Sequence, residues 1–137
     1  YTNAVPKEHS ADNEIWENLE DFILSRDDNS SRRVSMLTGP ILRQDDPFYH
    51  GVQAPSSFWK IMIYKRADGS LSVSGFIVEF APSSAENDHV FQCSVAMIEK
   101  LTNLNFGNLH SLDKMSSIEP TSRSLMRSLL REQDIVF

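Results

Sequence analysis

The chain has 137 residues, of which 40% are hydrophobic and 23% charged, and its net charge is −6 at pH 7. This is the balance of a soluble globular protein, and we expect a single domain over 1–137. No stretch approaches the ~20 apolar residues of a membrane helix, and no basic, apolar leader opens the sequence, so we expect no membrane partner. The single cysteine, Cys93, excludes an internal disulfide and makes a cytoplasmic setting the default expectation.

The negative charge is concentrated at the start of the chain. Residues 1–30 hold two basic and eight acidic groups, which gives −6, whereas residues 31–137 hold eleven of each. A solvated helix face and the neighbourhood of a divalent metal ion are both compatible with this distribution.

The first predicted element is a helix over residues 10–26. Ser10 or Asp12 can cap its N-terminus, because a side-chain oxygen there accepts a hydrogen bond from the first turn. Five apolar residues recur at helical spacing and predict one buried stripe: Ile15, Trp16, Leu19, Phe22 and Ile23.

Strands follow this helix. Residues 33–37 read as a buried strand that ends at Thr38-Gly39-Pro40, and residues 43–51 read as a long polar loop. Residues 58–64 are rich in aromatic and β-branched side chains, which favours a second strand.

A hairpin is predicted next, because Asp68-Gly69 separates this strand from an apolar run over residues 71–80. Residues 90–94 predict a short strand and residues 95–102 a short helix. Asn103 suits the left-handed position that commonly ends a helix.

The last element is a predicted helix over residues 121–132, within a C-terminal extension over 111–137. Arg123, Arg127 and Arg131 recur every four residues there, as a basic stripe or as a solvated helix face. The order of elements predicts an α+β fold, a mostly antiparallel sheet packed with helices.

Five segments in order resemble motifs of the DNA/RNA non-specific endonuclease family, the ββα-metal nucleases that include endonuclease G. They are Thr2-Asn3-Ala4-Val5-Pro6, similar to S/T-N-x-x-P-Q; residues 12–20, similar to N-x-x-x-W-x-x-L-E; residues 34–40, similar to V-x-V-x-T-G-P; residues 54–60, similar to V-P-x-x-F/Y-W-K; and residues 98–106, similar to I-E-x-L-T-G-L-x-F. The resemblance covers roughly residues 1–110 and implies a ββα-metal nuclease-like fold that cleaves DNA and RNA.

The resemblance also implies a metal site for Mg²⁺ or Mn²⁺. Asp12 stands where the family has its metal-binding Asn, and Asn13 matches only after a shift of one residue, so either can be the ligand. Glu20 matches the family's catalytic Glu, and Asn3 matches an Asn that orients metal-bound water. Because residues 12 and 20 are about 12 Å apart along a helix, Glu20 is expected to act through water.

Three departures qualify the resemblance. Leu24 replaces an arginine that many relatives have, and Lys7 replaces a glutamine. The Asp-Arg-Gly-His motif that carries the general base is absent, and the four histidines lie in other contexts: His9, His50, His89 and His110. We expect that histidine in an upstream segment or on a companion chain, which makes this chain the C-terminal portion of the nuclease domain and inactive alone.

Structural roles compete with each functional assignment. Asp12 can be only a helix cap, Glu20 only a solvent-facing acid, and Trp16 and Trp59 core aromatics. Lys60 can contact phosphate, although a strand lysine whose ammonium reaches solvent is the commoner outcome.

Three functions therefore remain open. The first is a Mg²⁺-dependent, sequence-nonspecific endonuclease that hydrolyses phosphodiester bonds. The second is a catalytically degenerate relative that serves protein interaction or assembly. The third, an unrelated α+β binding domain, requires five accidental matches in order.

Overall fold

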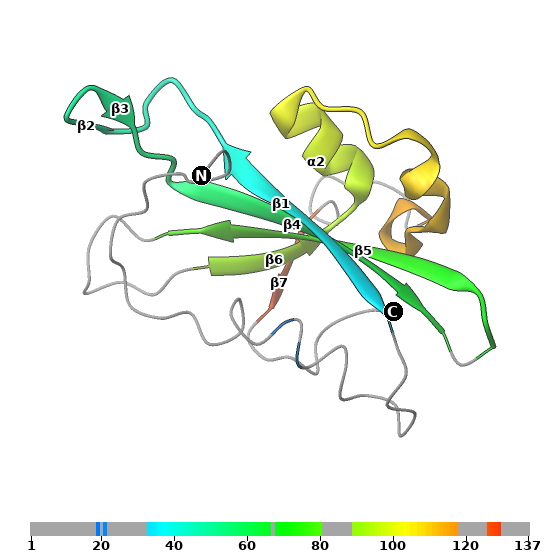
Figure 1. The fold of residues 1–137 in the computed structure, drawn as a ribbon. Helices are drawn as coiled ribbons and strands as arrows, with labels where there is room; N and C mark the ends of the chain where they lie inside the picture. The colour runs from blue at the N-terminus through cyan, green and yellow to red at the C-terminus, as the bar shows by residue number, and fades with distance from the viewer. Residues whose placement is uncertain are drawn as a thin grey trace.

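The most β-branched and aromatic stretches of the chain form the central strands of one sheet in a computed structural model. The structure describes residues 19, 21, 33–66, 68–80, 89–117 and 126–129, with only the backbone of residues 117 and 126–129. Five strands form the sheet in the order β1-β4-β5-β6-β7, and each neighbouring pair is antiparallel (Figure 1). Their bounds are β1 Val34–Ile41, β4 Ser57–Lys65, β5 Leu71–Glu79, β6 His89–Cys93 and β7 Met126–Leu129.

The hairpin between β4 and β5 forms where the sequence predicts it. Lys65 pairs with Leu71 at its closed end, and Gly69 has a φ of 86°, which glycine adopts without steric cost. The Asp68 carboxylate accepts hydrogen bonds from the Ser70 amide (2.9 Å) and hydroxyl (2.6 Å). Local chemistry thus fixes the turn and, through it, the register of the two central strands.

The first strand is longer than predicted, and it is not the buried strand that we expected, because residues 35–38 are exposed. We expected Thr38-Gly39-Pro40 to end it, but β1 continues through all three residues to Ile41. Among the described strands β1 is the last in the sheet order, and such a strand tolerates a proline because one side of its backbone needs no ladder partner.

A second, small hairpin replaces part of the polar loop expected over 43–51. It consists of β2 (Phe48–Tyr49) and β3 (Val52–Gln53) and projects beyond the ends of β1 and β4 (Figure 1). His50 and Gly51 form its turn, with φ values of 51° and 81°. Both values are those of a tight hairpin turn, in which the two central residues are left-handed.

Alternate side chains of the strands supply two separate cores, one on each face of the sheet. One face is covered by α2 (Val95–Thr102) and the 3-10 helices η1 (Gly107–Leu112) and η2 (Lys114–Ser117), and we call it the helix-covered face (Figure 1). Its core contains Ile41, Trp59, Ile61, Val73, Ile77, Cys93, Val95 and Ile98.

The opposite face, which we call the Leu19 face, buries Leu19 with Met62, Tyr64, Phe76, Val78 and Val90. Leu19 and Asp21 are both helical, as predicted for this part of the chain, and the rest of the helix expected over 10–26 lies outside the described residues. The Leu19 face therefore holds one residue of the segment that resembles the family's metal-binding helix.

The prediction of a C-terminal helix over 121–132 is wrong where the structure describes it. Residues 126–129 form β7, in which Leu129 pairs with Val90 and Arg127 pairs with Gln92. Helical propensity is a weak preference that the open edge of a sheet overrides. A stripe of arginines along one helix face is therefore also wrong at Arg127.

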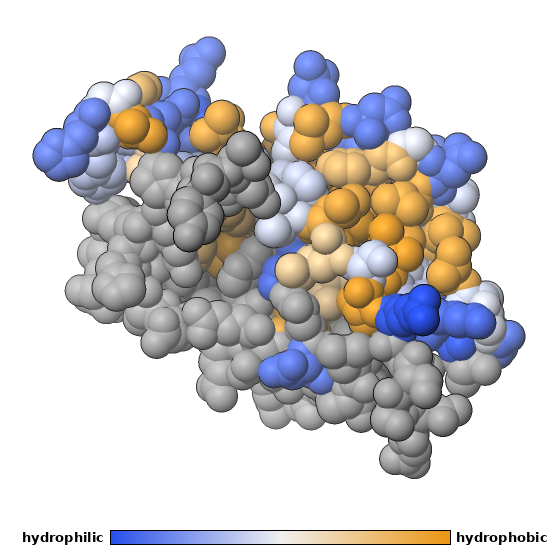
Figure 2. Space-filling model, in the orientation of Figure 1, coloured by the Kyte–Doolittle hydropathy of each residue, from blue (hydrophilic) through white to orange (hydrophobic). Residues whose placement is uncertain are grey.

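The mostly antiparallel sheet with few helices agrees with the predicted α+β class. In the described part of the chain, none of the helices has the length and apolar character needed to cross a membrane. On the surface, apolar residues gather where α2 and the 3-10 helices lie beside β1 (Figure 2), and they include Leu37, Leu101, Leu104 and Leu112.

Candidate functional site

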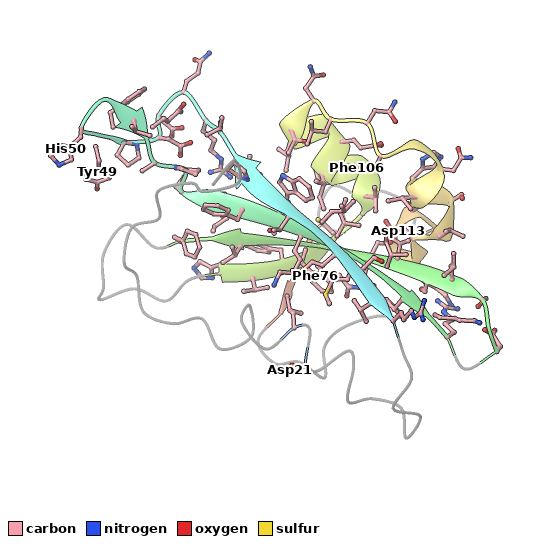
Figure 3. All side chains as sticks on the ribbon, in the orientation of Figure 1. Asp21, Tyr49, His50, Phe76, Phe106 and Asp113 are labelled. Atoms are coloured by element: carbon pink, nitrogen blue, oxygen red, sulfur yellow. The ribbon has the colours of Figure 1, made fainter. Side chains whose placement is uncertain are left out.

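Three of the motif segments meet around the side chain of Trp59. Thr38-Gly39-Pro40 on β1 lies directly opposite residues 58–60 on β4, so Gly39 faces Trp59. A Cβ atom on Gly39 would lie 2.9 Å from Trp59 Cζ2, closer than real carbon contacts allow. On its other side Trp59 makes an edge contact with Phe106, whose ring centroid is 5.2 Å away (Figure 3). Trp59 is therefore a core aromatic, as expected.

The segment that carries Phe106 is shaped by its own capping interactions. The Ser94 hydroxyl accepts a hydrogen bond from the Met97 amide (3.2 Å) at the start of α2. Asn103 ends the helix in the left-handed conformation, with a φ of 57°, which confirms the sequence prediction. The Glu99 carboxylate then accepts a bond from the Phe106 amide (2.7 Å) and holds the chain as it turns back to Trp59.

The Leu19 face buries polar side chains of its strands. Lys60 is 6% exposed and Gln92 is 1% exposed, and the two flank Phe76 in the strand register. Nearby, the Tyr64 and Ser74 hydroxyls lie 3.3 Å apart and share a hydrogen bond. Lys60 is thus a strand lysine whose side chain lies largely beneath other atoms of the fold.

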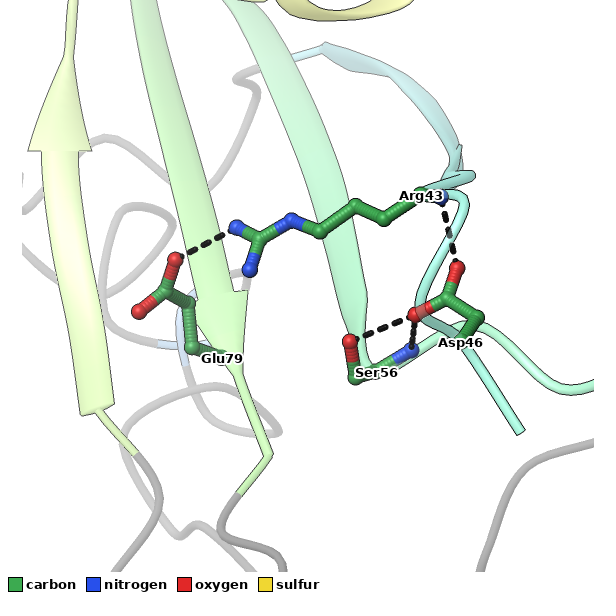
Figure 4. Close-up of polar contacts among 4 residues, drawn as sticks. All are labelled: Arg43, Asp46, Ser56 and Glu79. Atoms are coloured by element: carbon green, nitrogen blue, oxygen red, sulfur yellow. Dashed lines mark hydrogen bonds and ion pairs between the residues drawn. The ribbon is translucent and has the colours of Figure 1, made fainter.

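A buried carboxylate that sequence analysis missed closes the loop after β1 (Figure 4). The Asp46 oxygens accept hydrogen bonds from the Arg43 amide (2.7 Å), the Ser56 amide (3.0 Å) and the Ser56 hydroxyl (2.7 Å). The Arg43 guanidinium then forms an ion pair with Glu79 on β5, at 2.7 Å. We call these four residues the Asp46 network.

The Asp46 network controls the charge of its central carboxyl. Burial alone would raise the pKa of Asp46, but the hydrogen bonds from Arg43 and Ser56 and the positive charge of Arg43 lower it below 3.8. The only sequence signal for this network was the pair Asp45 and Asp46 in a predicted polar loop. The tertiary structure shows that Asp46 is the buried one. The network fixes the end of β1 to β4 through its hydrogen bonds and ion pair. Asp46 is therefore a structural residue rather than a reactive one.

Asp113 is the corresponding carboxylate beneath the helix-covered face. It accepts bonds from the Val95 amide (2.8 Å) and the Met115 amide (2.9 Å), so it joins the start of α2 to η2 (Figure 3). Burial raises the pKa of Asp113 despite these bonds. Burial, and then the charge of Asp113, also raise the pKa of the Cys93 thiol, which makes Cys93 a core side chain and not a nucleophile.

The four predicted site residues lie outside the described residues: Asn3, Asp12, Asn13 and Glu20. Among the residues that are described, no group of three or more His, Cys, Asp or Glu side chains could hold a metal ion. The metal donors that the resemblance implies therefore remain predictions, and the nearest described neighbours are Leu19, which is buried, and Asp21, which is exposed.

The chain is similar to one known family along most of its length. The profile of the family described as DNA/RNA non-specific endonuclease matches residues 1–111. The uncharacterized protein y4fB of Sinorhizobium fredii (strain NBRC 101917 / NGR234) is 28% identical over 126 residues, which cover 79% of this chain and 19% of that protein. No solved structure matches the chain.

This chain spans only 19% of the length of y4fB, so that relative says nothing about the activity of a whole protein. The family match does not depend on it, because residues 1–111 cover most of the 137 residues and include all five motif segments. The chain belongs to the DNA/RNA non-specific endonuclease family.

Proposed function

We propose that the chain is part of a Mg²⁺-dependent endonuclease that hydrolyses phosphodiester bonds in DNA and RNA without sequence preference. The observation that carries this proposal is the family match over residues 1–111. The fold supports it, because the motif segments at 34–40, 54–60 and 98–106 pack together. Such agreement between motif and contact is not expected of accidental matches.

The proposed metal donor is Asp12, with Asn13 as the alternative, and Asn3 would orient metal-bound water. Glu20 would orient water molecules of the same site. Carboxylate and amide oxygens suit a hard cation such as Mg²⁺ or Mn²⁺. When bound, the cation would offset negative charge on the phosphate that is cleaved. The burial of Leu19 supports this assignment, because it ties the residue before Glu20 to the sheet.

The general base is assigned to no residue of this chain. In the family that role belongs to the histidine of Asp-Arg-Gly-His, and none of the four histidines here stands in such a motif. We propose that another part of the natural protein supplies it. A companion chain, which the sequence also allowed, has no support from the family match.

The test is a cleavage assay with the full-length natural protein, on plasmid DNA and on RNA. We expect cleavage of both substrates with Mg²⁺, none with EDTA, and recovery when Mg²⁺ is added back. Glu20→Gln should lower the rate by about 10–100-fold, the range for groups that orient a metal site. Asp21→Asn is the matched control, since it removes an exposed carboxylate one residue away and should leave the rate unchanged.

A catalytically degenerate module is the second candidate. It is favoured by Asp12 in place of asparagine and by Leu24 in place of the family's arginine. A folded full-length protein that cleaves neither substrate with Mg²⁺ or Mn²⁺ would support this candidate and refute the first.

A further inference from the structure

The two ends of the sheet differ in charge among the residues that the structure describes. Where β1 ends and β4 begins, one basic side chain, Arg43, stands with three carboxylates, those of Asp45, Asp46 and Glu79, which gives −2. Where β4 turns into β5, two carboxylates, those of Asp68 and Asp113, stand with four basic side chains, Arg33, Lys65, Arg66 and Lys114, which gives +2.

The strand register places three of these basic residues side by side. Val34 pairs with Tyr64, so Arg33, the residue before Val34, comes next to Lys65 on the neighbouring strand. Arg66 follows Lys65 where β4 enters its turn into β5. Neighbouring strands are about 4.8 Å apart, so these side chains can reach successive charges of one polyanion. We call Arg33, Lys65 and Arg66 the basic end.

The side chains of the basic end are available at the surface. Arg33 and Lys65 are exposed, and the stem of Lys65 lies along the turn, with its Cε atom 3.6 Å from the place that a Cβ atom on Gly69 would take. Arg66 is half-buried, and its guanidinium donates a hydrogen bond to the Ser72 hydroxyl at 2.8 Å. This bond orients the guanidinium and does not neutralise it.

The two carboxylates near the basic end are held by hydrogen bonds of their own loops. Asp68 accepts bonds from the amide and the hydroxyl of Ser70. Asp113 is buried and accepts bonds from the Val95 and Met115 amides. Of the groups that the structure describes at this end, those presented to solvent are therefore mainly positive.

We propose that the basic end binds the phosphate backbone of the nucleic-acid substrate, through Arg33, Lys65 and Arg66, without reading its sequence. This inference rests on the proposed function and names a contact surface for its substrate. Contacts from lysine and arginine to phosphate supply the sequence-independent part of the affinity for nucleic acid. Because the net charge of −6 repels a polyanion, a local positive surface is needed to hold one. The three residues bind substrate and take no part in the chemical step.

The experiment measures binding of the full-length protein to a fluorescent DNA duplex by anisotropy. EDTA is present, so that no cleavage is needed, and the salt concentration is varied from about 50 to 200 mM. The variants are Lys65→Gln, Arg33→Gln/Lys65→Gln, the triple variant that adds Arg66→Gln, and the charge-preserving Arg33→Lys/Lys65→Arg. Lys100→Gln is the matched control, since Lys100 is an exposed lysine in the last turn of α2, outside the basic end.

The expected result is a stepwise loss of salt dependence. Each phosphate contact contributes about 1 to the slope of log affinity against log salt, because it releases a bound counterion. Lys65→Gln should therefore lower the slope by about 1, the double variant by about 2 and the triple variant by about 3. The charge-preserving variant and Lys100→Gln should keep the wild-type slope. Thermal unfolding checks that each variant folds, and if the triple variant does not, the double variant still decides.

An anionic membrane is the competing partner, because the exposed Leu71 pairs with Lys65 and basic groups beside apolar ones suit a lipid surface. The family match favours nucleic acid. The same variants are therefore also sedimented with vesicles of phosphatidylserine and phosphatidylcholine. Vesicle binding that falls in the double variant while its DNA slope stays at the wild-type value assigns the basic end to lipid and overturns the proposal.

The remaining outcomes separate the basic end from the proposed function. A wild-type DNA slope in the folded double variant, or an equal loss in Lys100→Gln, overturns the basic end while the nuclease function stands. A protein that binds DNA through the basic end but cleaves neither DNA nor RNA with Mg²⁺ or Mn²⁺ overturns the nuclease function and supports the binding surface.

Discussion

The two faces of the sheet use the same strands for different purposes. The helix-covered face is closed by Trp59, Phe106 and the apolar side of α2, and the buried carboxylate Asp113 beneath it is bonded to backbone amides. The Leu19 face mixes an apolar cluster with buried Lys60 and Gln92. Motif residues on the first face are thus explained by packing, whereas the second face buries a charged residue of the same motif.

Strand β4 makes this division because its side chains alternate between the faces. Trp59 and Lys60 are consecutive, yet they lie on opposite faces of the sheet. A family motif that reads as one unit in the sequence therefore places consecutive residues on opposite faces of the sheet.

The largest expected effect is on the helix-covered face. Trp59→Ala removes the ring that Gly39 and Phe106 both contact, and should lower the free energy of unfolding by about 3–5 kcal/mol. Urea unfolding of the full-length protein, followed by circular dichroism, measures this. A loss no larger than that of the exposed control Ser35→Ala would show that Trp59 does not organise this core.

Gly39→Ala tests the same contact from the other strand. Its new methyl group would lie 2.9–3.0 Å from indole atoms of Trp59, and overpacking of this kind costs about 1–3 kcal/mol of unfolding free energy. In a Trp59→Phe background the cost should fall, because the smaller ring lacks the indole atoms that the methyl group meets. Additive losses in the double variant would contradict the close approach.

The smallest expected effect concerns the Asp46 network, which belongs to neither core. Asp46→Asn places an amide NH₂ group where a carboxylate oxygen accepts a bond, which leaves a backbone amide without its acceptor at a cost of about 1–2 kcal/mol at neutral pH. The difference from wild type should be measured by thermal unfolding between neutral and strongly acidic pH.

The direction of this pH dependence follows from the lowered pKa of Asp46. Its charged form is favoured by the fold, so the stabilisation is fully present above the unfolded pKa of 3.8 and is lost as the pH falls through the lower folded pKa. Wild type and Asp46→Asn should therefore converge at the acidic end. A difference that stays constant over the whole range would show that the charge of Asp46 contributes nothing.

Local rules predicted the elements whose signals are complete within a few residues. The turn at Asp68-Gly69, the helix over residues 95–102 and its end at Asn103 all depend on side chains that bond to their own neighbours. These interactions form whatever the rest of the chain does, so the sequence alone specifies them. The antiparallel class of the sheet was predicted from equally local signals, namely the hairpin turn and the alternation of side chains along the strands.

Partners far apart in the chain decided the rest. The continuation of β1 through Pro40 depends on its place at the end of the sheet order, and β7 exists because β6 offers an edge to pair with. The burial of Lys60 and Asp46 depends on residues that the fold brings from other strands and loops. Sequence by itself determined the family, the hairpin turn and the helix caps, because each depends on residues that lie close together in the chain. Tertiary structure alone decided which charged side chains leave water, because burial is a property of the packed chain.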